Sequence, residues 1–369
     1  MDTLVLGPDF HAIKAFDLPE NVVGASRYGH GHINDTYCVI CQPKEGDAIR
    51  YILQGLSTTA FADPHALMDN FIGITTFLRE KIIQAGGDPT RETLDIVRTI
   101  DGKAYYTDDT GKVWRMMPFI EGTDCLQKAT PELFEASARA FGRFQKLLQS
   151  YPAEQLHETI PRFHDTEDRF NKLLIAIQKD QAGRVKQCQN EIQFAFSRKE
   201  DCSVLMQAYR DGKLPLRVTH NDTKLNNLLI DRKTGEGICV IDLDTTMPGF
   251  SVNDFGDSIR FGANRGSEDE AEEDKILFDI DLYEAYTRGF MEGAAGVLTE
   301  AEIEHLPWGA RLMTLECGIR FLTDYLDGDV YFRADFPEQN LIRARSQFKL
   351  VHDMETQFEQ MQAIVIKYL

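Results

Sequence analysis

Residues 218–231 read VTHNDTKLNNLLID, and residues 232–237 read RKTGEG before the chain continues as ICVIDLD over 238–244. The apolar runs at 228–230 and 238–241 predict two short strands. The turn between them contains glycine, which favours a tight reversal of the chain, so the stretch predicts a β-hairpin. A hairpin brings its two ends together, and we therefore expect the polar residues at its entrance and exit to lie close to one another.

Three of those polar residues form a set that suits magnesium-dependent phosphoryl transfer. Asp222 and Asn227 precede the first strand, and Asp242 follows the second. Mg²⁺ prefers hard oxygen ligands and takes only one or two carboxylates from a protein, so Asn227 and Asp242 are the predicted metal ligands. The separate carboxylate of Asp222 is the predicted catalytic group, because the attacking hydroxyl must be oriented and must lose its proton. A single aspartate more often serves a turn, but here spacing, residue type and secondary structure agree.

The pattern His220-x-Asp222-x4-Asn227, followed by Ile241-Asp242, resembles the catalytic and metal-binding loops of aminoglycoside phosphotransferase-type kinases, small-molecule relatives of the protein kinases. Within that family the string at 220–227 is similar to the N-acetylhexosamine 1-kinases, and further similar strings lie at 241–245, 247–249, 254–262 and 316–322. The resemblance extends from about Tyr28 to the C-terminal helices. It implies ATP and Mg²⁺ as cofactors and a small-molecule hydroxyl as phosphoryl acceptor.

The pattern of the chain changes near residue 120. Short β-rich runs separated by glycine-containing turns occupy residues 20–60. A helix with an apolar stripe is predicted to begin at Asp63-Pro64, and helical periodicity dominates after residue 120. Together with the resemblance this predicts an α+β, two-lobed, protein-kinase-like fold. Residues 1–120 are the expected nucleotide-binding lobe, and residues 121–369 are the expected catalytic and substrate-binding lobe.

Composition limits the possible partners. The 369 residues include 40 basic and 59 acidic side chains, giving a net charge of −19, which argues against non-specific binding to nucleic acids or anionic membranes. No apolar run approaches the ~18 residues needed to span a bilayer, and the start of the chain lacks the features of a secretory signal. Seven scattered cysteines suit a reducing compartment, so we expect a cytoplasmic protein with no protein partner implied.

The prediction of a nucleotide-binding region depends on a glycine-containing loop. Gly29 and Gly31 lie between two predicted strands, where glycine allows the backbone to approach a phosphate. The third strand of a kinase-like lobe should carry a phosphate-binding lysine, but Gln54 stands at that position. Either the metal and backbone groups suffice, or another cation such as Arg27 or Lys81 reaches the site.

Two further assignments follow from the resemblance. It implies that the segment around Met117 and Phe119 is the linker whose backbone meets the adenine. It also implies that the literal Asp254-Phe255-Gly256 is not the metal motif, because Asp242 already stands at the hairpin exit. The Asp254 region is instead expected to begin a helix that braces the catalytic loop.

The residues that bind the phosphoryl acceptor are the part of the expected site that the sequence defines least. The resemblance places His32, Asn34 and Arg320 at a sugar site, together with Asp222 itself. The alternatives are solvation for the two loop residues, and for Arg320 an ion pair with Glu316, one helical turn earlier.

Three further expectations concern groups around the loop. His220 is expected to hold it by packing and hydrogen bonds, and Asp244 is a second-metal ligand, a partner of the site or merely solvated. The acidic segment 268–274 is expected to be a solvated loop or helix start.

The resulting hypothesis is a transfer of the ATP γ-phosphate to the anomeric hydroxyl of N-acetylglucosamine or N-acetylgalactosamine, giving the sugar 1-phosphate, with both substrates in the cleft between the lobes. An aminoglycoside, choline or homoserine is the alternative acceptor. A nucleotide-binding pseudokinase is favoured by Gln54 but opposed by the intact Asp222, Asn227 and Asp242. A metal-dependent hydrolase lacks the additional histidines and carboxylates that such sites use.

Overall fold

The computed structural model describes residues 10–18, 21–29, 33–58, 61–128 and 130–369. Two compact units divide the chain. Unit 1 comprises residues 1–123, 154–161 and 238–247, and unit 2 comprises residues 124–153, 162–237 and 248–369. Two residues singled out in the sequence, Gly31 and His32, lie outside the described residues.

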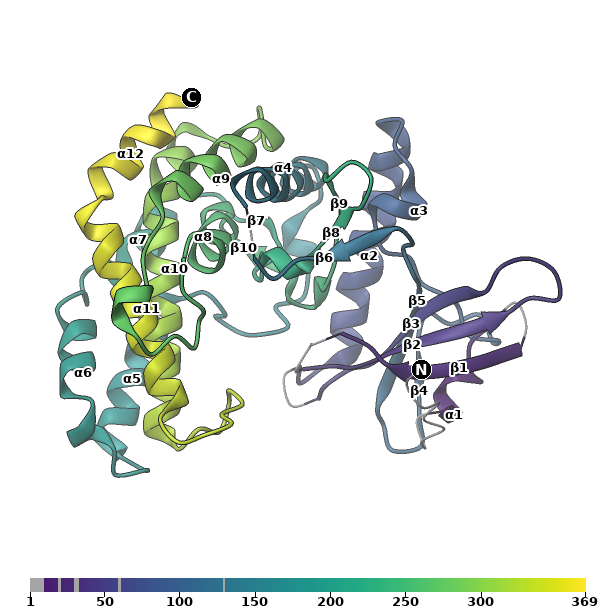
Figure 1. Ribbon diagram of the computed structural model, residues 1–369, viewed down its shortest axis with the longest axis horizontal. Helices are drawn as coiled ribbons and strands as arrows, with labels where there is room; N and C mark the ends of the chain where they lie inside the picture. The colour runs from purple at the N-terminus through teal and green to yellow at the C-terminus, as the bar shows by residue number, and fades with distance from the viewer. Residues whose placement is uncertain (1–9, 19–20, 30–32, 59–60, 129) are drawn as a thin grey trace. The chain divides into compact units, whose positions relative to one another are not determined.

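Unit 1 is built on an antiparallel sheet, shown in Figure 1, whose five strands among the described residues have the order β1-β2-β3-β5-β4. The bounds are β1 (Asn21–Arg27), β2 (Asp35–Gln42), β3 (Ile49–Gly55), β4 (Tyr106–Thr107) and β5 (Val113–Pro118). One cluster of buried side chains joins Val39, Leu53, Trp114 and Met116 with the short helix α1 (Phe10–Ile13). The strand-rich N-terminal region predicted from the sequence is confirmed.

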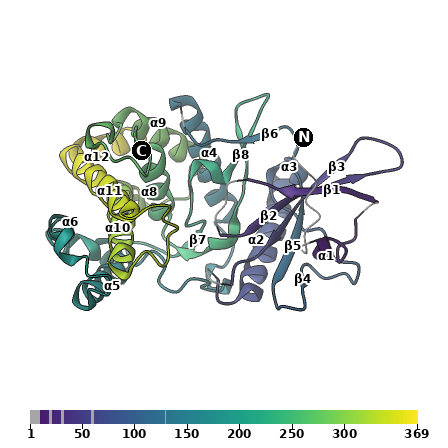
Figure 2. The ribbon, with the colours of Figure 1, turned by 60° about the horizontal axis from the view of Figure 1, so that its bottom comes forward.

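Helix α2 (Pro64–Gln84) lies beside this sheet (Figure 2). It begins as predicted, because the Asp63 carboxylate accepts hydrogen bonds from the backbone N–H groups of His65 and Ala66 at 3.0 and 3.1 Å. Proline occupies the first helical position, where no backbone donor is needed. Leu67, Phe71 and other residues of its apolar stripe are buried. A single turn, α3 (Pro89–Glu92), follows.

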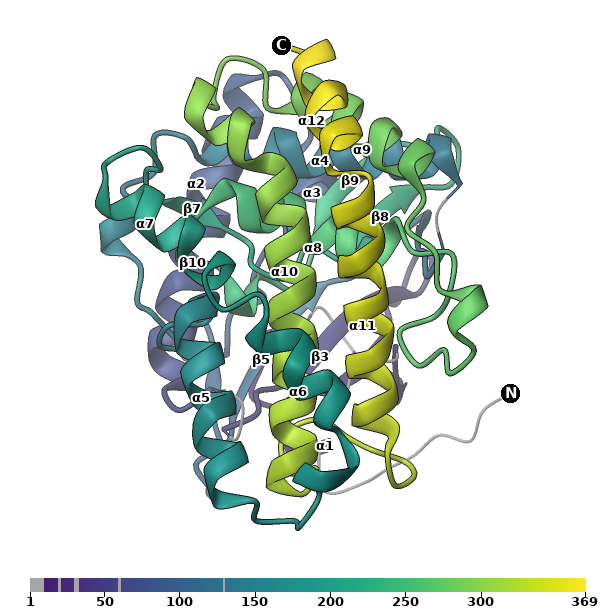
Figure 3. The same cartoon turned by 90° about the vertical axis from the view of Figure 1, so that its left-hand side faces the viewer.

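Unit 2 is mostly helical. Its long helix α10 (Glu300–Asp327) begins with a capping box in which Thr299 and Glu302 bond each other's backbone N–H groups. Figure 3 shows α10 alongside α5 and α11. The helices packed in this unit are α4 (Pro131–Leu148), α5 (Thr166–Lys179), α6 (Gln189–Phe196), α7 (Val204–Arg210), α8 (Ser251–Gly262), α9 (Ile280–Gly293), α11 (Gln339–Thr356) and α12 (Phe358–Lys367). None of the helices among the described residues is long and apolar enough to cross a membrane.

The predicted hairpin is present. Its strands are β8 (Leu228–Asp231) and β9 (Gly237–Val240), and β6 (Thr123–Cys125) pairs with the other edge of β8. A second small ladder joins β7 (Arg217–Thr219) to β10 (Met247–Gly249). The mixed α+β composition, with strands first and helices later, is therefore as predicted.

Helices α8 and α10 approach so closely that only glycine fits at the crossing. A Cβ atom added to Gly256 would lie 2.2 Å from the carbonyl oxygen of Gly309. A Cβ atom on Gly309 would lie 2.1 Å from the carbonyl oxygen of Val252. Since both obstacles are backbone atoms, the helices must separate to admit a side chain. The Gly256 of the literal Asp-Phe-Gly thus serves helix packing.

We predict that Gly256→Ala lowers the free energy of unfolding by about 1–3 kcal/mol, because the added methyl group forces α8 away from α10. Urea denaturation followed by circular dichroism measures the change. Glu304→Ala, at an exposed position of α10, is the control and should change stability by less than about 0.5 kcal/mol. Equal stability of Gly256→Ala and the wild-type protein would contradict the close crossing.

Candidate active site

The loop that joins β7 to β8 carries Asp222 and has an unusual backbone. Asn221 adopts a left-handed conformation with φ of 63°, which asparagine tolerates better than most residues. Its side chain is fixed locally, since the Thr219 hydroxyl donates to Oδ1 at 2.9 Å and Nδ2 donates to the Thr219 carbonyl at 3.2 Å. The strained residue is thus held directly before Asp222.

A buried carboxylate on α8 holds the same loop from the other side. Asp254 Oδ1 accepts the backbone N–H of Asn221 at 2.7 Å, and Oδ2 accepts that of His220 at 2.9 Å. The Gln145 side chain of α4 donates to Oδ2 at 2.6 Å. Burial raises the pKa of Asp254, and these donors oppose that shift only in part. The predicted bracing role of the Asp254 region is confirmed.

His220 serves the loop as an acceptor and as packing. Its side chain is fully buried between the edges of Phe141 and Phe144, with ring centroids 6.0 Å from each. Its Nδ1 accepts the backbone N–H of Asp222 at 3.2 Å. The prediction that His220 holds the loop is confirmed.

Asp222 lies between a cation and an amide. Its Oδ1 is 2.8 Å from Lys224 Nζ, and its Oδ2 accepts from Asn227 Nδ2 at 2.8 Å. Burial raises the pKa of Asp222, but the Lys224 ammonium and the Asn227 amide outweigh it, so the pKa lies below its ordinary value. The carboxylate is about one quarter exposed and is ionised at neutral pH. Asn227 also donates to the Asp222 carbonyl at 2.8 Å, which leaves its Oδ1 as the oxygen suited to a cation.

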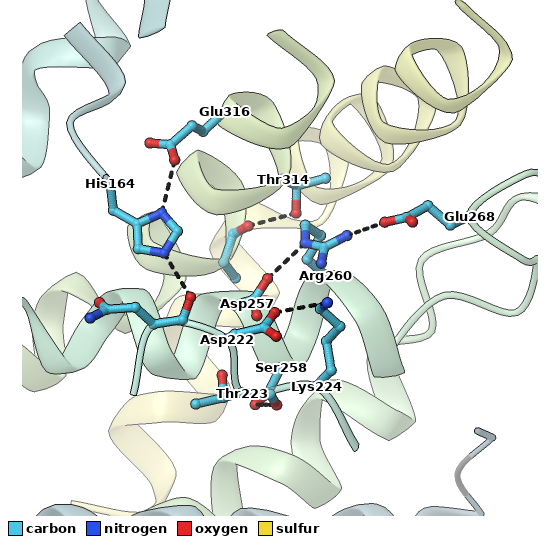
Figure 4. Close-up of polar contacts among 12 residues, drawn as sticks. His164, Asp222, Thr223, Lys224, Asp257, Ser258, Arg260, Glu268, Thr314 and Glu316 are labelled. Carbon is cyan, nitrogen blue, oxygen red and sulfur yellow. Dashed lines mark hydrogen bonds and ion pairs between the residues drawn. The ribbon is translucent and has the colours of Figure 1, made fainter. Parts of the chain in front are cut away.

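A chain of alternating charges continues from Lys224. Burial lowers the pKa of the Lys224 ammonium. The carboxylates of Asp222 and Asp257 raise the same pKa by more than burial lowers it, so Lys224 stays protonated. Figure 4 shows Arg260 between Asp257 and Glu268, at 2.9 and 2.7 Å. The acidic segment 268–274 is half-buried or exposed and leads into the single turn η6 (Glu273–Lys275), as expected, and Glu268 is in addition held by a buried arginine.

Sequence reasoning missed His164, which links the loop to α10. Its Nε2 lies 3.0 Å from the Asn221 carbonyl oxygen, and its Nδ1 lies 2.9 Å from Glu316 Oε1 (Figure 4). Glu316 is buried, and Thr166 donates to its other oxygen at 2.8 Å. Burial raises the pKa of Glu316, but the interaction with His164, including their hydrogen bond, and the positive charges of nearby arginines outweigh burial and lower the pKa.

Arg320, one turn further along α10, lies among aromatic rings. Its guanidinium carbon is 5.2 Å from the ring centroid of Phe163, 5.3 Å from that of Phe332 and 5.9 Å from that of Tyr331. Within the part of the chain that the structure describes, no side chain forms a hydrogen bond or an ion pair with Arg320. The alternative of an ion pair with Glu316 is therefore wrong, because that carboxylate is used by His164 and Thr166.

The glycine loop and the predicted linker meet in unit 1. Gly29 has φ of 78°, a left-handed conformation that favours glycine. Apart from Gly29 and its two chain neighbours, no heavy atom of the described residues lies within 4 Å of the position that a Cβ atom would take there. The preceding Tyr28 packs edge-on against Phe119, with ring centroids 5.6 Å apart. Met117 is buried at the end of β5. The roles of these residues in nucleotide binding stay predictions.

Gln54 has a cationic neighbour that the sequence analysis did not name. Arg115, on the adjacent strand β5, donates two hydrogen bonds to Gln54 Oε1 at 3.0 and 2.8 Å. The two cations suggested earlier lie elsewhere. Arg27 is largely exposed and pairs with Asp35 at 2.6 Å, and Lys81 lies over the ring of Phe77. The visible signal for Arg115 was one charged residue within an otherwise apolar strand.

The structure brings together part of the predicted triad. Asp222 and Asn227 are hydrogen-bonded in unit 2. Asp242 belongs to unit 1, is exposed and has a left-handed backbone with φ of 59° and ψ of 53°. Its convergence with the other two stays a prediction. Asn34 and Arg320 likewise stay predicted sugar contacts. In the structure the Asn34 amide donates to Asp244 at 2.6 Å.

Three solved structures of kinases and phosphotransferases have folds similar to that of this chain. An aminoglycoside phosphotransferase from Alicyclobacillus acidocaldarius matches with a TM-score of 0.61 at 14% identity, over 97% of this chain and 98% of that one. A microcompartment-associated aminopropanol kinase matches with a TM-score of 0.59 at 15% identity, over 95% and 97%. An amicoumacin kinase in complex with AMP-PNP and Ca²⁺ matches with a TM-score of 0.56 at 16% identity, over 90% and 88%. These likenesses confirm the kinase-like α+β fold.

The family model of the phosphotransferase enzyme family (APH) matches residues 25–290, which is well over half of the chain. The matched region includes the loop of Asp222 and Asn227, the hairpin that follows it and helix α8. The protein therefore belongs to the phosphotransferase enzyme family.

Proposed function

We propose that the protein transfers the γ-phosphoryl group of ATP to the anomeric hydroxyl of an N-acetylhexosamine, giving the sugar 1-phosphate and ADP. The observation that carries the proposal is the Asp222 carboxylate, held ionised by Lys224 and hydrogen-bonded to Asn227. Membership of the phosphotransferase family supports the reaction class. The resemblance of the loop to N-acetylhexosamine 1-kinases supports the acceptor.

Asp222 would orient the attacking hydroxyl and accept its proton. The transition state of phosphoryl transfer is loose, so a weakly basic carboxylate suffices when it is well positioned. The positioning comes from the backbone bonds of the loop to Asp254 and from the bond of Asp222 N–H to His220. The ammonium of Lys224 keeps the carboxylate ionised and adds positive charge where phosphate oxygens would lie.

Asn227 and Asp242 are the proposed ligands of Mg²⁺. Their donor chemistry fits, because the Asn227 Oδ1 and an exposed carboxylate are the hard oxygens that this cation prefers. When bound, Mg²⁺ would neutralise charge on the transferring phosphates. Gly29, Gly31 and the linker at Met117 and Phe119 are the proposed nucleotide contacts.

The surroundings of Arg320 favour a neutral acceptor over a cationic one. Faces of aromatic rings recognise quaternary ammonium groups, but the rings of Phe163, Tyr331 and Phe332 already lie around a guanidinium. A second arginine, Arg169, donates to the Phe163 carbonyl at 2.6 Å, which adds positive charge nearby. An arginine without a hydrogen-bond acceptor among the described residues suits sugar hydroxyl or acetamide oxygens. His32 and Asn34 are the other proposed sugar contacts.

An amino alcohol or aminoglycoside is the second candidate acceptor. Aminopropanol kinase and aminoglycoside phosphotransferase structures share the fold, and the net charge of −19 favours a cationic ligand. The test is turnover of Mg·ATP with N-acetylglucosamine, N-acetylgalactosamine, kanamycin, choline, 3-aminopropanol and homoserine in parallel. We expect ADP release above background with an N-acetylhexosamine. Turnover with only one of the cationic acceptors would replace the proposed substrate, and turnover with none would reject the proposal.

Asp222→Asn should lower kcat by about 10²–10⁴-fold, since the amide cannot accept a proton. Mg·ATP affinity should change less than about threefold, since Asp222 is not a proposed metal ligand. Coupled detection of ADP and equilibrium nucleotide binding measure the two quantities. Asp211→Asn, at an exposed position, is the control and should behave as wild type. A near-normal rate of Asp222→Asn would reject the assignment of the base.

Lys224→Met should move the acidic limb of the kcat–pH profile to higher pH. The reason is that Asp222 must be ionised to act, and removing the ammonium leaves burial to raise its pKa. In the wild-type protein this limb should lie below the ordinary pKa of an aspartate, about 3.9. Profiles are recorded only over the pH range in which each variant stays folded by circular dichroism. Lys233→Met, in the exposed hairpin turn, is the control, and an unmoved limb in Lys224→Met would refute the coupling.

Arg320→Met should raise the KM for the sugar by about tenfold or more, because a charged hydrogen bond to the acceptor is lost. The KM for ATP should stay within about twofold. Arg333→Met removes a largely exposed arginine that pairs with Asp335, and it should leave both constants unchanged. Steady-state kinetics with each substrate varied in turn separate the two effects. An unchanged sugar KM in Arg320→Met would remove this residue from the acceptor site.

A further inference from the structure

Unit 1 contains a buried ion pair that the proposed chemistry does not use. Arg115 NH1 lies 2.5 Å from Asp244 Oδ1, and the two side chains are 1% and 2% exposed. The rest of the guanidinium is also engaged, because Nε and NH2 both donate to Gln54 Oε1. The Phe71 ring of α2 lies beneath it, with 4.5 Å between the guanidinium carbon and the ring centroid. Arg115 is therefore fixed from three sides.

The second oxygen of Asp244 extends this pair to the end of the glycine loop. Asn34 Nδ2 donates to Asp244 Oδ2 at 2.6 Å. Asn34 Oδ1 in turn accepts the backbone N–H of Ser57 at 3.0 Å. One continuous polar cluster thus joins strand β5, strand β3, the residue before β2 and the short 3₁₀ turn η5 (Leu243–Thr245).

The ion pair holds a residue two positions after Asp242. Asp242 immediately precedes η5 and has a left-handed backbone, a conformation that is uncommon outside glycine but that aspartate adopts more readily than most residues. Asp244 lies two residues later and is immobilised at both oxygens. A buried ion pair contributes little net stability compared with well-packed apolar residues, and in some proteins such a pair serves instead to select one conformation. This pair is therefore a candidate for orienting the turn and the exposed Asp242 carboxylate.

We infer that Arg115 is a positioning residue for cation binding: through Asp244 it orients the turn that carries Asp242 and ties that turn to Asn34 behind the glycine loop. The inference rests on the proposed role of Asp242 as a Mg²⁺ ligand. Groups that orient a metal ligand change metal affinity by about 10–100-fold when they are removed. The pair should therefore control how much Mg²⁺ the protein needs to bind nucleotide, whatever the acceptor is.

The test titrates Mg²⁺ against a fluorescent ATP analogue without any acceptor, using Arg115→Met, Asp244→Asn and the double variant. Each single variant leaves one buried charge without its partner and should lower the melting temperature. The double variant removes both charges and should recover much of that loss. In all three the half-saturating Mg²⁺ concentration should rise by about tenfold or more. Arg79→Met, which breaks a surface pair with Asp95, is the control and should change neither quantity.

A double variant with restored stability and a wild-type Mg²⁺ requirement would overturn the inference, because the pair would then be only structural. The same conclusion follows if a folded single variant keeps the wild-type requirement. If a single variant fails to fold, the Mg²⁺ requirement of the double variant alone decides whether Arg115 positions the turn. A wild-type protein that binds Mg·nucleotide but phosphorylates no N-acetylhexosamine would reject the proposed substrate, while the Mg²⁺ titration would still decide the role of Arg115.

Discussion

The buried carboxylate of Asp254 is the constraint on which the loop that carries Asp222 depends. A carboxylate in a protein interior must be surrounded by donors, and here two consecutive backbone N–H groups and one glutamine amide supply them. Because the donors include the backbone of His220 and Asn221, satisfying the carboxylate fixes the path of the chain directly before Asp222. The helix α8 that carries Asp254 is itself held against α10 by glycine contacts that allow no side chain.

The loop is held by several groups that converge on a few residues. Asn221 accepts a left-handed backbone while its carbonyl lies 3.0 Å from His164. The Thr223 hydroxyl donates to the Asp254 carbonyl, and Ser258 donates to the Thr223 carbonyl. A strained backbone persists where its surroundings over-determine it. Asp222 and Asn227 are thereby presented on a rigid support, which is what reactions governed by positioning require.

Electrostatics at this loop differ from those of the whole chain. The protein is strongly acidic, yet Lys224, Arg260 and Arg320 gather within unit 2 near the loop or on the helices that hold it. Two of them are balanced by carboxylates, while Arg320 is surrounded by aromatic rings instead. A polyanionic nucleotide can therefore be accommodated by local charges despite the net charge of the molecule. The same local arrangement is the observation that supports the proposal of a neutral acceptor.

The bracing role of the Asp254 region was implied by the resemblance to aminoglycoside phosphotransferase-type kinases. Local patterns in the sequence predicted the hairpin, helix α2 and the closeness of Asp222 to Asn227. These features depend on short spacings, caps and apolar periodicity, which sequence displays directly. The partners His164–Glu316 and Arg115–Asp244 were not predicted, because each joins residues more than 100 positions apart through tertiary packing. One sign of Arg115 was visible in the sequence, because it is a charged residue within an otherwise apolar strand. No sequence signal pointed to His164. Helical spacing allowed an ion pair between Arg320 and Glu316 as the alternative to a sugar contact, but Glu316 is bonded to His164 and Thr166 instead.

The most direct test of the account is ³¹P NMR of the product formed from Mg·ATP and an N-acetylhexosamine, with a ¹H–³¹P correlation to identify the phosphorylated oxygen. We predict a new phosphomonoester resonance that correlates with the anomeric proton. This resonance should require Mg²⁺ and should be absent with Asp222→Asn. A phosphomonoester correlated with any other sugar proton would contradict the proposed acceptor hydroxyl. A product that forms equally well with Asp222→Asn would contradict the central role of this carboxylate.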